Sequence, residues 1–486
     1  FRSKLLDTTY RMAYTVIFYW ICYPYWRKKQ TERIARHCMV PKDRVIAYPH
    51  YLTHAASVAY GMPQPDEQVV VITLDGAGDT YCGSISIKQG NTLNTIHKIK
   101  NKHSLAGVYG NTTRVLGMKM NEHEYKVMGL APYTNKQHYG IPRVKKQLAA
   151  LLQVNGIHMN ATVSERHYFS FLKRALDGER FDAIAAGLQQ FFTENICTWT
   201  DAVIKHTGIK HVAAAGGAFM NVKGNAAIAN TTAAKTLTII PSAADESTSI
   251  GAAYLADQHI AETTNTPWNP TPCTHLYLGN TVTNEQVEQY KNTHTIPASW
   301  TFQELGDHTA EAVADILANG HAIARVAGNM EFGARALGNR SIIADPRSTD
   351  IVQLINDQIK SRDFWMPFAG SILQEYADDY LINPKNVDAT FMIQSFKTTP
   401  LAQQHLPAAM HRYDKTIRPQ VVTRQHNPDY YDIIDAFRQK TGVAGVLNTS
   451  YNIHGEPMVC TVEDAFSAFE RSGLKYLLVA NILCKK

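Results

Sequence analysis

Short apolar runs alternate with glycine-rich or polar turns along most of the chain. Val69–Leu74 is a β-branched apolar run that ends in a glycine-rich segment, and Tyr81–Lys88 resumes the pattern, which predicts a strand, a tight turn and a second strand. Phe181–Ala202 carries apolar residues at helical spacing. His211–Ala215 is another short apolar run, and it stops at two glycines. Strands that alternate with helices in both halves of the chain predict an α/β fold class.

A change of composition divides the chain into two parts. Residues 263–274 are rich in Thr, Pro and Asn, which is typical of a linker. A helical pattern at 308–319, a strand pattern at 321–326 and further mixed α/β segments follow it. The length of 486 residues allows roughly two or three domains at about 150 residues each. We therefore predict one domain over residues 1–262 and a second over residues 275–486.

Composition and charge narrow the class of protein. The net charge of +6 is small for this length, so a dedicated nucleic-acid-binding protein is disfavoured, although a local basic pocket remains open. None of the seven cysteines forms a CxxC pair, which favours reduced thiols and a cytoplasmic location. The longest apolar run, Met12–Trp26, is too short for a membrane span and lacks a small-residue cleavage site, so we expect neither a span nor a signal peptide.

Two histidines and an aspartate form a candidate metal site. His50 and His54 are four residues apart, so on a helix both imidazoles lie on one face and can reach one ion. They supply only half a site, and a packed helix explains them equally well. Asp245 precedes a small-residue helix, where it either caps that helix or completes a two-His, one-carboxylate set suited to iron(II).

Two glycine segments are candidate phosphate sites. Asp75-Gly76-Ala77-Gly78-Asp79 separates two predicted strands, and Gly216-Gly217 lies between a strand and a helix that begins near Asn221. Backbone N–H groups in such turns can approach phosphate oxygens, and a helix N-terminus favours negative charge. The aspartates that flank the first segment can hold a metal or orient a nucleotide. An ordinary hairpin turn and a tight strand–helix turn remain the alternatives.

The segment 325–347 is a candidate anion site. It holds four arginines and three glycines, and Arg side chains suit bidentate recognition of phosphate or carboxylate. Gly328 and Gly333 have Walker A spacing, but Ala334-Arg335 follows instead of Lys-Ser/Thr, so we exclude a P-loop. A second polar segment, 447–457, follows the apolar strand pattern 443–447 and predicts either a turn or the polar floor of a pocket.

Six of these segments and the stretch 123–133, in order along the chain, resemble the O-carbamoyltransferase family of nodulation-factor and antibiotic-tailoring enzymes, from about Ala47 to Lys486. The strings that carry the resemblance are HYLTHAASVAYG, LDGAGD, HEYKVMGLAPY, GGAFMN, DESTSIGAA, NMEFGARALGNRSIIADPR and VLNTSYNIHGEPMV. The family implies an actin/hexokinase-like ATPase (Kae1-like) domain followed by an α+β YrdC-like domain. It also implies that carbamoyl phosphate and ATP give carbamoyl adenylate, from which the carbamoyl group passes to a hydroxyl of a small-molecule natural product. The cofactors would be ATP, Fe(II) or another divalent metal, and Mg(II).

The resemblance also implies roles for particular residues. The implied metal ligands, with a catalytic role, are His50, His54 and Asp245. The implied nucleotide-binding residues are Asp75, Gly76, Lys126, Gly216, Gly217 and Asn221. The residues implied to bind carbamoyl phosphate and the adenylate are Arg335, Arg340, Arg347, Lys360, Arg362, Arg418, Asn448, Ser450 and Asn452, of which Arg335 and Asn448 are also catalytic.

Two departures from the family pattern leave alternatives open. The usual opening strand and phosphate loop are not visible before Ala47, so we expect that portion of the first domain to be absent from this sequence. Met366 stands where an Arg often precedes the Pro-Phe pair. A tRNA threonylcarbamoylation-type enzyme and a catalytically inactive nucleotide-binding protein are the alternative functions. Nucleic acid and membranes are not expected as partners, and a homodimer is a possible assembly.

Overall fold

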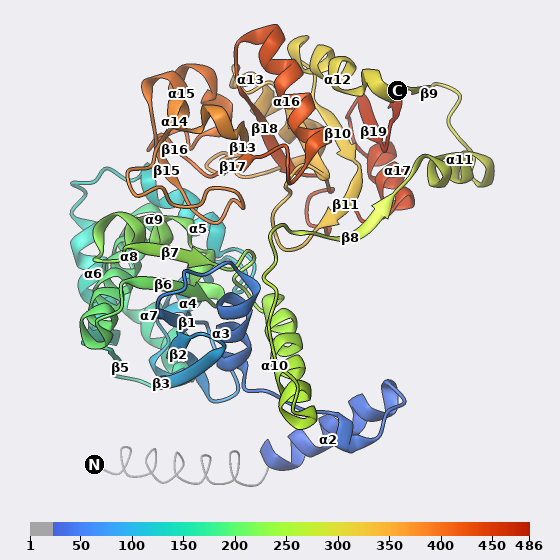
Figure 1. Ribbon diagram of the computed structural model, residues 1–486. Coiled ribbons are helices and arrows are strands. Elements are labelled where there is room, and N and C mark those ends of the chain that lie inside the picture. The colour runs from blue at the N-terminus through green and yellow to red at the C-terminus, as the bar shows by residue number, and fades with distance from the viewer. Residues whose placement is uncertain (1–22) are drawn as a thin grey trace, which may run out of the picture.

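The computed structural model describes residues 23–486 as two groups of α/β elements joined by an extended segment (Figure 1). The blue-to-green elements surround one sheet, and the yellow-to-red elements surround a second, larger sheet. We call them the first and second modules. Most of the apolar run Met12–Trp26 lies outside the described residues, and of that region the structure describes the helix α2, Tyr23–His37.

The first module is built on a five-stranded sheet of order β3-β2-β1-β6-β7. Strand β1 pairs antiparallel with β2 and parallel with β6, and both β1 and β6 are buried along their whole length. Because Thr73 of β1 lies opposite Ala215 of β6, the two parallel strands end at the same edge of the sheet. The segments that follow them, Asp75-Gly76 and Gly216-Gly217, therefore lie beside one another. The strands are β1 Val69–Leu74, β2 Tyr81–Gln89, β3 Thr92–Lys100, β6 His211–Ala215 and β7 Thr236–Ile239.

Helices α3 (His50–Gly61) and α10 (Ser247–Thr264) cross at close range beside this sheet (Figure 1). A Cβ on Gly251 of α10 would lie 1.8 Å from the carbonyl oxygen of Thr53, so only glycine permits the approach. The crossing brings the start of α3 next to the segment that precedes α10. The other helices of this module are α4 Leu105–Val115, α5 Glu124–Leu130, α6 Gly140–Leu151, α7 Tyr168–Ala175, α8 Phe181–Thr207 and α9 Val222–Thr231, and a small hairpin pairs β4 Leu152–Asn155 with β5 His158–Ala161.

The second module contains an eight-stranded mixed sheet of order β17-β13-β18-β12-β10-β19-β20-β9. Its strands are β9 Thr301–Glu304, β10 Ile323–Val326, β12 Arg340–Ala344, β13 Ala369–Leu373, β17 Pro419–Val422, β18 Gly445–Ser450, β19 Tyr476–Val479 and β20 Ile482–Lys485. Its helices are α11 Asn284–Thr293, α12 Thr309–Ala318, α13 Asp350–Ile355, α14 Ala377–Tyr380, α15 Pro400–His405, α16 Pro428–Thr441 and α17 Val462–Arg471. Two smaller sheets pair β8 Tyr277–Val282 with β11 Gly328–Glu331, and β15 Phe396–Thr398 with β14 Leu381–Ile382 and β16 Thr416–Ile417.

The predicted α/β fold class is confirmed, and the mixed five-stranded sheet agrees with the actin/hexokinase-like core that the resemblance implies. One expectation needs correction. The strand that contains the apolar run 443–447 does not end at Leu447. Strand β18 continues through the polar residues Asn448, Thr449 and Ser450. These three positions are strand, since they pair with β12 on one side and Asn448 pairs with β13 on the other, and the turn within 447–457 lies later, at His454 and Gly455.

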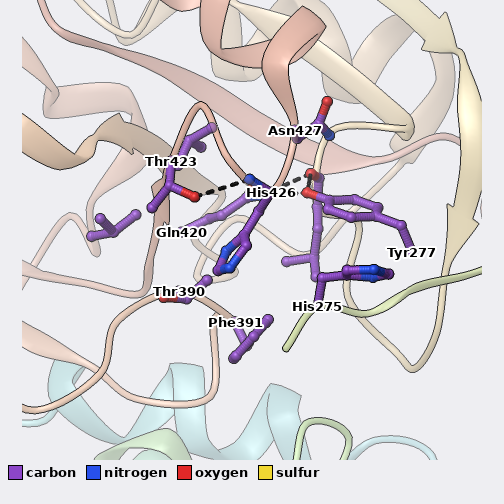
Figure 2. A pocket seen from close by; sticks show the side chains of 11 residues that line it. His275, Tyr277, Thr390, Phe391, Gln420, Thr423, His426 and Asn427 are labelled. Carbon is purple, nitrogen blue, oxygen red and sulfur yellow. Dashed lines mark hydrogen bonds between the residues drawn. The ribbon is translucent and has the colours of Figure 1, made fainter. Parts of the chain in front are cut away.

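The connecting segment between the modules packs into the second one. Helix α10 ends at Thr264, so the first two residues of the expected linker belong to that helix. Further along, His275 and Tyr277 line a pocket of the second module together with Gln420, His426 and Asn427 (Figure 2).

Polar contacts hold the two modules together. His411 Nε2 lies 2.8 Å from the carbonyl oxygen of Gly129, and Asn225 Nδ2 donates to the carbonyl of Ile393 at 2.8 Å. Lys223 pairs with Asp414 across the same boundary. Residues at this boundary are therefore placed by both modules.

Candidate active site

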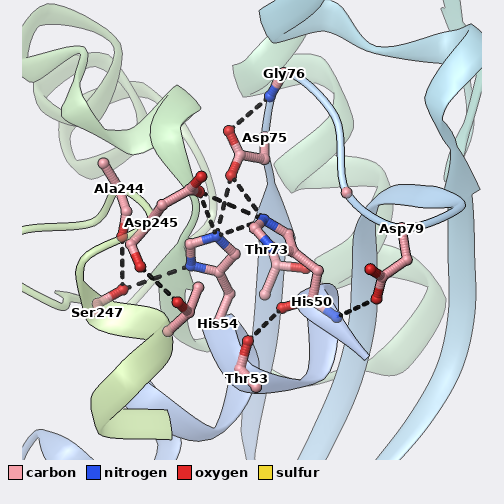
Figure 3. Close-up of polar contacts among 12 residues, drawn as sticks. His50, Thr53, His54, Thr73, Asp75, Gly76, Asp79, Ala244, Asp245 and Ser247 are labelled. Carbon is pink, nitrogen blue, oxygen red and sulfur yellow. Dashed lines mark hydrogen bonds and ion pairs between the residues drawn. The ribbon is translucent and has the colours of Figure 1, made fainter. Parts of the chain in front are cut away.

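Four side chains converge where α3, β1 and the segment before α10 meet (Figure 3). The Nε2 atoms of His50 and His54 are 3.1 Å apart, and Oδ2 of Asp75 lies 3.2 Å and 3.0 Å from them. Oδ1 of Asp245 lies 3.4 Å and 3.5 Å from the same two nitrogens. One ligand atom from each of the four residues thus falls within 4.8 Å of every other. The expected grouping of His50, His54 and Asp245 is therefore seen in the geometry, with Asp75 as a further member.

Local structure orients each member of this group. The backbone N–H of His50 donates to Oδ2 of Asp79 at 3.0 Å, which fixes the start of α3 (Figure 3). Asp75 directly follows the buried strand β1, and its Oδ1 accepts a hydrogen bond from the N–H of Gly76 at 2.6 Å. His54 is almost fully buried, whereas 74% of the Asp245 side chain is exposed. The group is thus rigid on the β1 side and open on the Asp245 side.

The electrostatics of the group favour a cation. Burial disfavours the charged form of His54, but hydrogen bonds to Asp245 and Asp75 outweigh it and raise the pKa of this imidazole. Burial also opposes ionisation of Asp75, yet its hydrogen bonds to His50 and His54 hold the pKa of this carboxyl well below the ordinary value. Two imidazole nitrogens and two carboxylate oxygens form a donor set that suits iron(II) or another divalent transition metal. The residues present therefore fit such an ion.

The second glycine segment lies directly against Asp75. A Cβ on Gly217 would lie 2.8 Å from Oδ1 of Asp75. Asn221 ends the segment and caps α9, since its Oδ1 accepts from the N–H of Gly224 at 2.9 Å. Asn221 also exchanges two hydrogen bonds with Gln189 of α8, at 3.1 Å and 3.0 Å. The sequence indicated Gly216, Gly217 and Asn221 but missed Gln189, which lies within the apolar helical pattern of α8.

Lys126, expected on the nucleotide side, lies at the boundary between the modules. Its Nζ is 3.1 Å from Oδ2 of Asp363 in the second module. Its carbonyl oxygen accepts a hydrogen bond from Nε1 of Trp365 at 3.1 Å. Helix α5 is therefore anchored to the loop that contains the departure at Met366.

Three arginines of the second module form a cluster that we call the arginine cluster: Arg335, Arg362 and Arg418. Burial, followed by the charges of Arg335 and Arg362, lowers the pKa of Arg418 well below its ordinary value. Burial, opposed by Tyr125 and aided by the charge of Arg335, lowers the pKa of Arg362 to about 10. Among residues 23–486, no carboxylate pairs with any of the three, and Nε of both Arg335 and Arg418 is buried without a hydrogen-bond partner. Close positive charges that form no ion pair with a carboxylate are typical of an anion site.

The first module reaches this cluster. Tyr125 of α5 and Glu246, the residue after Asp245, both interact electrostatically with Arg335. The loop that carries Arg335 also packs against the first module, since a Cβ on Gly333 would lie 3.0 Å from Cβ of Ser242. We call His50, His54, Asp75 and Asp245 the metal-type group. This group and the arginine cluster therefore meet at the boundary between the two modules.

Glu331 shapes the loop that carries Arg335, and the sequence analysis missed it. Its buried Oε1 accepts backbone N–H bonds from Leu337, Asn339 and Arg340 at 2.6, 3.1 and 3.2 Å. Glu331 is the one acidic residue between Arg325 and Arg340, which is the signal that could have found it, because three N–H groups in one turn need an acceptor.

Next to the arginine cluster lies a buried lysine. Lys360 is 2% exposed, and its Nζ contacts Oδ1 of Asn452 at 2.6 Å and Oγ of Ser450 at 3.2 Å. Burial, with a contribution from Arg362, holds the pKa of Lys360 well below the ordinary value. Arg362 donates to Oγ1 of Thr449 at 3.0 Å, so the end of β18 holds both the Lys360 and the Arg362 side chains. These residues were expected together, and the structure brings them together.

Two of the arginines expected to bind carbamoyl phosphate form hydrogen bonds with other groups of the protein instead. Arg340 is fully buried, and its guanidinium donates to the backbone carbonyls of Asn280, Ala327, Gly328, Asn339 and Cys460. Arg347 forms a bidentate pair with Asp345, with a shortest contact of 2.6 Å. The neighbouring loop satisfies Arg340 and a carboxylate neutralises Arg347, so we leave both out of the arginine cluster.

Two further expectations concern thiols and membranes. The six cysteines of the described residues, Cys38, Cys82, Cys197, Cys273, Cys460 and Cys484, form no disulfide. Over residues 23–486, no helix combines the length and the apolar character that a bilayer crossing requires.

Comparison with known proteins identifies the family. A model described as the carbamoyltransferase N-terminus matches residues 12–254, and one described as the carbamoyltransferase C-terminus matches residues 314–486. Nodulation protein NolO of Bradyrhizobium diazoefficiens is 30% identical over 447 residues, which cover 90% of this chain and 78% of that protein. An uncharacterized protein of Synechocystis sp. is 30% identical over 468 residues, 90% of this chain and 75% of its own length. Among solved structures, T. kodakarensis HypF aligns over 48% of this chain and 39% of that one at 14% identity, with a TM-score of 0.29, which is too low to bear on function. Two consecutive family models, and relatives 30% identical over 90% of this chain, show that the chain belongs to the carbamoyltransferase family.

Proposed function

We propose that the protein is an ATP-dependent O-carbamoyltransferase that uses carbamoyl phosphate to carbamoylate a hydroxyl of a small-molecule natural product. The observation that carries the proposal is the meeting of two complementary sites at the module boundary. The metal-type group of His50, His54, Asp75 and Asp245 lies in one module, and the arginine cluster lies in the other. Glu246 and Arg335 connect them electrostatically.

The arginine cluster would bind the phosphate of carbamoyl phosphate. Arg side chains without acidic partners compensate phosphate charge, and a partly buried site strengthens that interaction. In the first step, water cleaves carbamoyl phosphate to carbamate and inorganic phosphate. Lys360, held by Ser450 and Asn452, would add a short-range donor at the end of β18.

The second step would join carbamate to ATP. A carbamate oxygen attacks the α-phosphorus, the bond to the β-phosphate oxygen breaks, and carbamoyl adenylate and pyrophosphate form. The backbone around Gly76, Gly216 and Gly217 would bind the nucleotide phosphates, because glycines let N–H groups approach closely. Carbamate is unstable in water, so an interior shared by both modules would protect it.

The third step would transfer the carbamoyl group. The acceptor oxygen attacks the carbamoyl carbon, AMP leaves, and the hydroxyl proton is released. His50, His54, Asp75 and Asp245 would hold a divalent metal, which supplies Lewis-acid polarisation of the carbamoyl oxygen when bound. The exposed position of Asp245 leaves that side of the group open to an acceptor.

A pyrophosphate exchange assay tests this function without knowledge of the acceptor. The full-length chain is incubated with ATP, labelled pyrophosphate, Mg²⁺ and Fe²⁺, with or without carbamoyl phosphate. We expect label to enter ATP only when carbamoyl phosphate is present, since adenylate formation is reversible. Arg418→Met should abolish exchange, whereas Arg412→Met, which alters an exposed arginine outside the cluster, should not.

Two outcomes would contradict the proposal. Absence of exchange in the unaltered chain, with ATP binding intact, would favour an inactive nucleotide-binding protein. Exchange that proceeds without carbamoyl phosphate would mean that another acid is activated.

A further inference from the structure

The buried amide oxygen of Asn448, Oδ1, has no hydrogen-bond partner among the described residues. Asn448 lies inside β18 with 0% of its surface exposed. Its Nδ2 donates to the carbonyl of Ala336 at 3.2 Å, to Oγ of Ser371 at 3.0 Å and to Oε1 of Gln420 at 3.2 Å. Across residues 23–486, nothing donates to its Oδ1. A buried acceptor without a donor is costly, so it points to a ligand that supplies one.

The surrounding hydrogen bonds allow only one orientation of this amide. The carbonyl of Ala336 can only accept, so it must face Nδ2 of Asn448. Gln420 is fixed in the same way, because its Nε2 donates to the carbonyl of Leu337 at 2.8 Å, which leaves Oε1 toward Asn448. A flipped Asn448 would place Oδ1 against two acceptors. Two backbone carbonyls therefore set the direction of the whole network.

Gln420 connects Asn448 to the pocket beside the linker. Gln420 lies opposite Ser371 in the pairing of β17 with β13, and it accepts a hydrogen bond from that serine at 2.8 Å. Its Nε2 also lies 3.3 Å from the hydroxyl of Tyr277, which itself donates to Leu337. Tyr277, Leu337 and Gln420 all line the pocket (Figure 2). Packing at the linker thus supports the orientation of Asn448.

Each arginine of the arginine cluster lies near a residue of this hydrogen-bond network. Arg335 precedes Ala336, and Arg418 stands two residues before Gln420. Arg362 donates to Thr449, the neighbour of Asn448. A phosphate held by these arginines would therefore place its carbamoyl group near Asn448.

We propose that Gln420 is a positioning residue that holds Asn448 with Oδ1 as an acceptor for the N–H of the carbamoyl group. The inference rests on the proposed function, in which Asn448 belongs to the carbamoyl phosphate site. The network selects carbamoyl phosphate over acyl phosphates, such as acetyl phosphate, whose methyl group has no N–H to donate. A buried site built to form a hydrogen bond rejects an analogue that cannot form it.

A matched pair of stable phosphonates measures this selectivity directly. Phosphonoacetamide carries the amide N–H, and acetonylphosphonate replaces the amino group with a methyl group. Binding of each to the full-length chain is measured by calorimetry, with inorganic phosphate as the reference for the arginine cluster. We expect the unaltered chain to bind the amide about tenfold or more tightly than the ketone, as one unmatched acceptor would cause.

Three variants separate positioning from general damage. Asn448→Ala should reduce the preference to about twofold or less, and Gln420→Leu should do the same while phosphate affinity changes less than about twofold. Ser371→Ala, a milder change at the same network, should reduce the preference in the same direction. Adding Gln420→Leu to Asn448→Ala should cause no further loss of preference, because both act through one amide.

Several outcomes would overturn the inference. It fails if the unaltered chain binds both phosphonates equally or neither, or if Gln420→Leu keeps the preference. It also fails if Gln420→Leu weakens phosphate and both phosphonates in parallel, since that indicates a general structural role. The binding assay contains no ATP, so a chain that discriminates the phosphonates but shows no pyrophosphate exchange would refute the proposed function and support this inference.

Discussion

The adjacent glycines Gly216 and Gly217 should respond in opposite ways to the same substitution. A Cβ on Gly216 would lie 2.4 Å from the carbonyl oxygen and 2.7 Å from the carbonyl carbon of Leu74, which belong to the backbone of the central strand β1. A Cβ on Gly217 would approach only the side chain of Asp75, at 2.8 Å from Oδ1. Gly216→Ala should therefore damage the fold, and Gly217→Ala should damage the metal-type group.

The expected magnitudes follow from these contacts. Gly216 has φ of 100°, which costs an alanine about 1–3 kcal/mol, and the clash with β1 adds about 1–3 kcal/mol of overpacking. Gly217 has no such backbone restriction, so Gly217→Ala should change the free energy of unfolding by less than about 1 kcal/mol. The displaced Asp75 carboxylate should weaken metal binding about 10- to 100-fold.

Urea unfolding and Co²⁺ titration by absorption spectroscopy measure the two effects. Gly178→Ala is the control for backbone strain alone, because Gly178 has φ of 76° and nothing within 4 Å of its Cβ position. Gly216→Ala should exceed that control by at least about 1 kcal/mol. Unchanged Co²⁺ affinity in Gly217→Ala would refute the assignment of Asp75 to the metal-type group, and a Gly216→Ala as stable as the control would refute the packing argument.

Three further predictions concern the second module and the boundary. Burial holds the pKa of Lys360 well below 10.5, so at pH values just below 10.5 the unfolded chain binds a proton that the folded chain lacks. The free energy of unfolding should therefore rise with pH through that interval. Urea midpoints measured against pH should show this rise, and the rise should be smaller in Lys360→Met. Arg340→Lys should lower the free energy of unfolding by about 2–4 kcal/mol, because an ammonium has three N–H donors for five carbonyls; an unchanged urea midpoint would contradict the structural role. Lys126→Ala and Asp363→Ala should be non-additive by about 0.5–1 kcal/mol in a double-mutant cycle, and full additivity would mean that the 3.1 Å ion pair contributes nothing to docking.

The sequence predicted the elements whose pattern is local. The apolar run of β1 and the helical spacing of α8 were predicted because burial on a sheet or helix leaves a regular period. The pairing of His50 with His54 was predicted for the same reason, since one turn of a helix places them on one face. Such features need only the residues within one element.

Contacts between elements explain what the sequence did not reveal. Asp75 was expected either to hold a metal or to orient a nucleotide, and its place among the histidines depends on the close crossing of α3 and α10 at Gly251. Arg335 and Arg340 stand in the same arginine-rich segment, yet five carbonyls surround only Arg340. Residue type could not separate these arginines, because the difference lies in a loop whose shape depends on the buried carboxylate of Glu331.

In β18, both the local sequence pattern and the contacts between elements are needed to explain the polar residues. A strand buried in the middle of a sheet normally carries apolar side chains on both faces, so Asn448 at its centre suggested that the strand had already ended. Asn448 is tolerated there because Ala336, Ser371 and Gln420 accept from its Nδ2, and these partners come from a loop, the neighbouring strand β13 and the strand β17 beyond it. The same contacts leave Oδ1 without a donor, so the residue that broke the apolar pattern is also the one whose packing predicts a ligand.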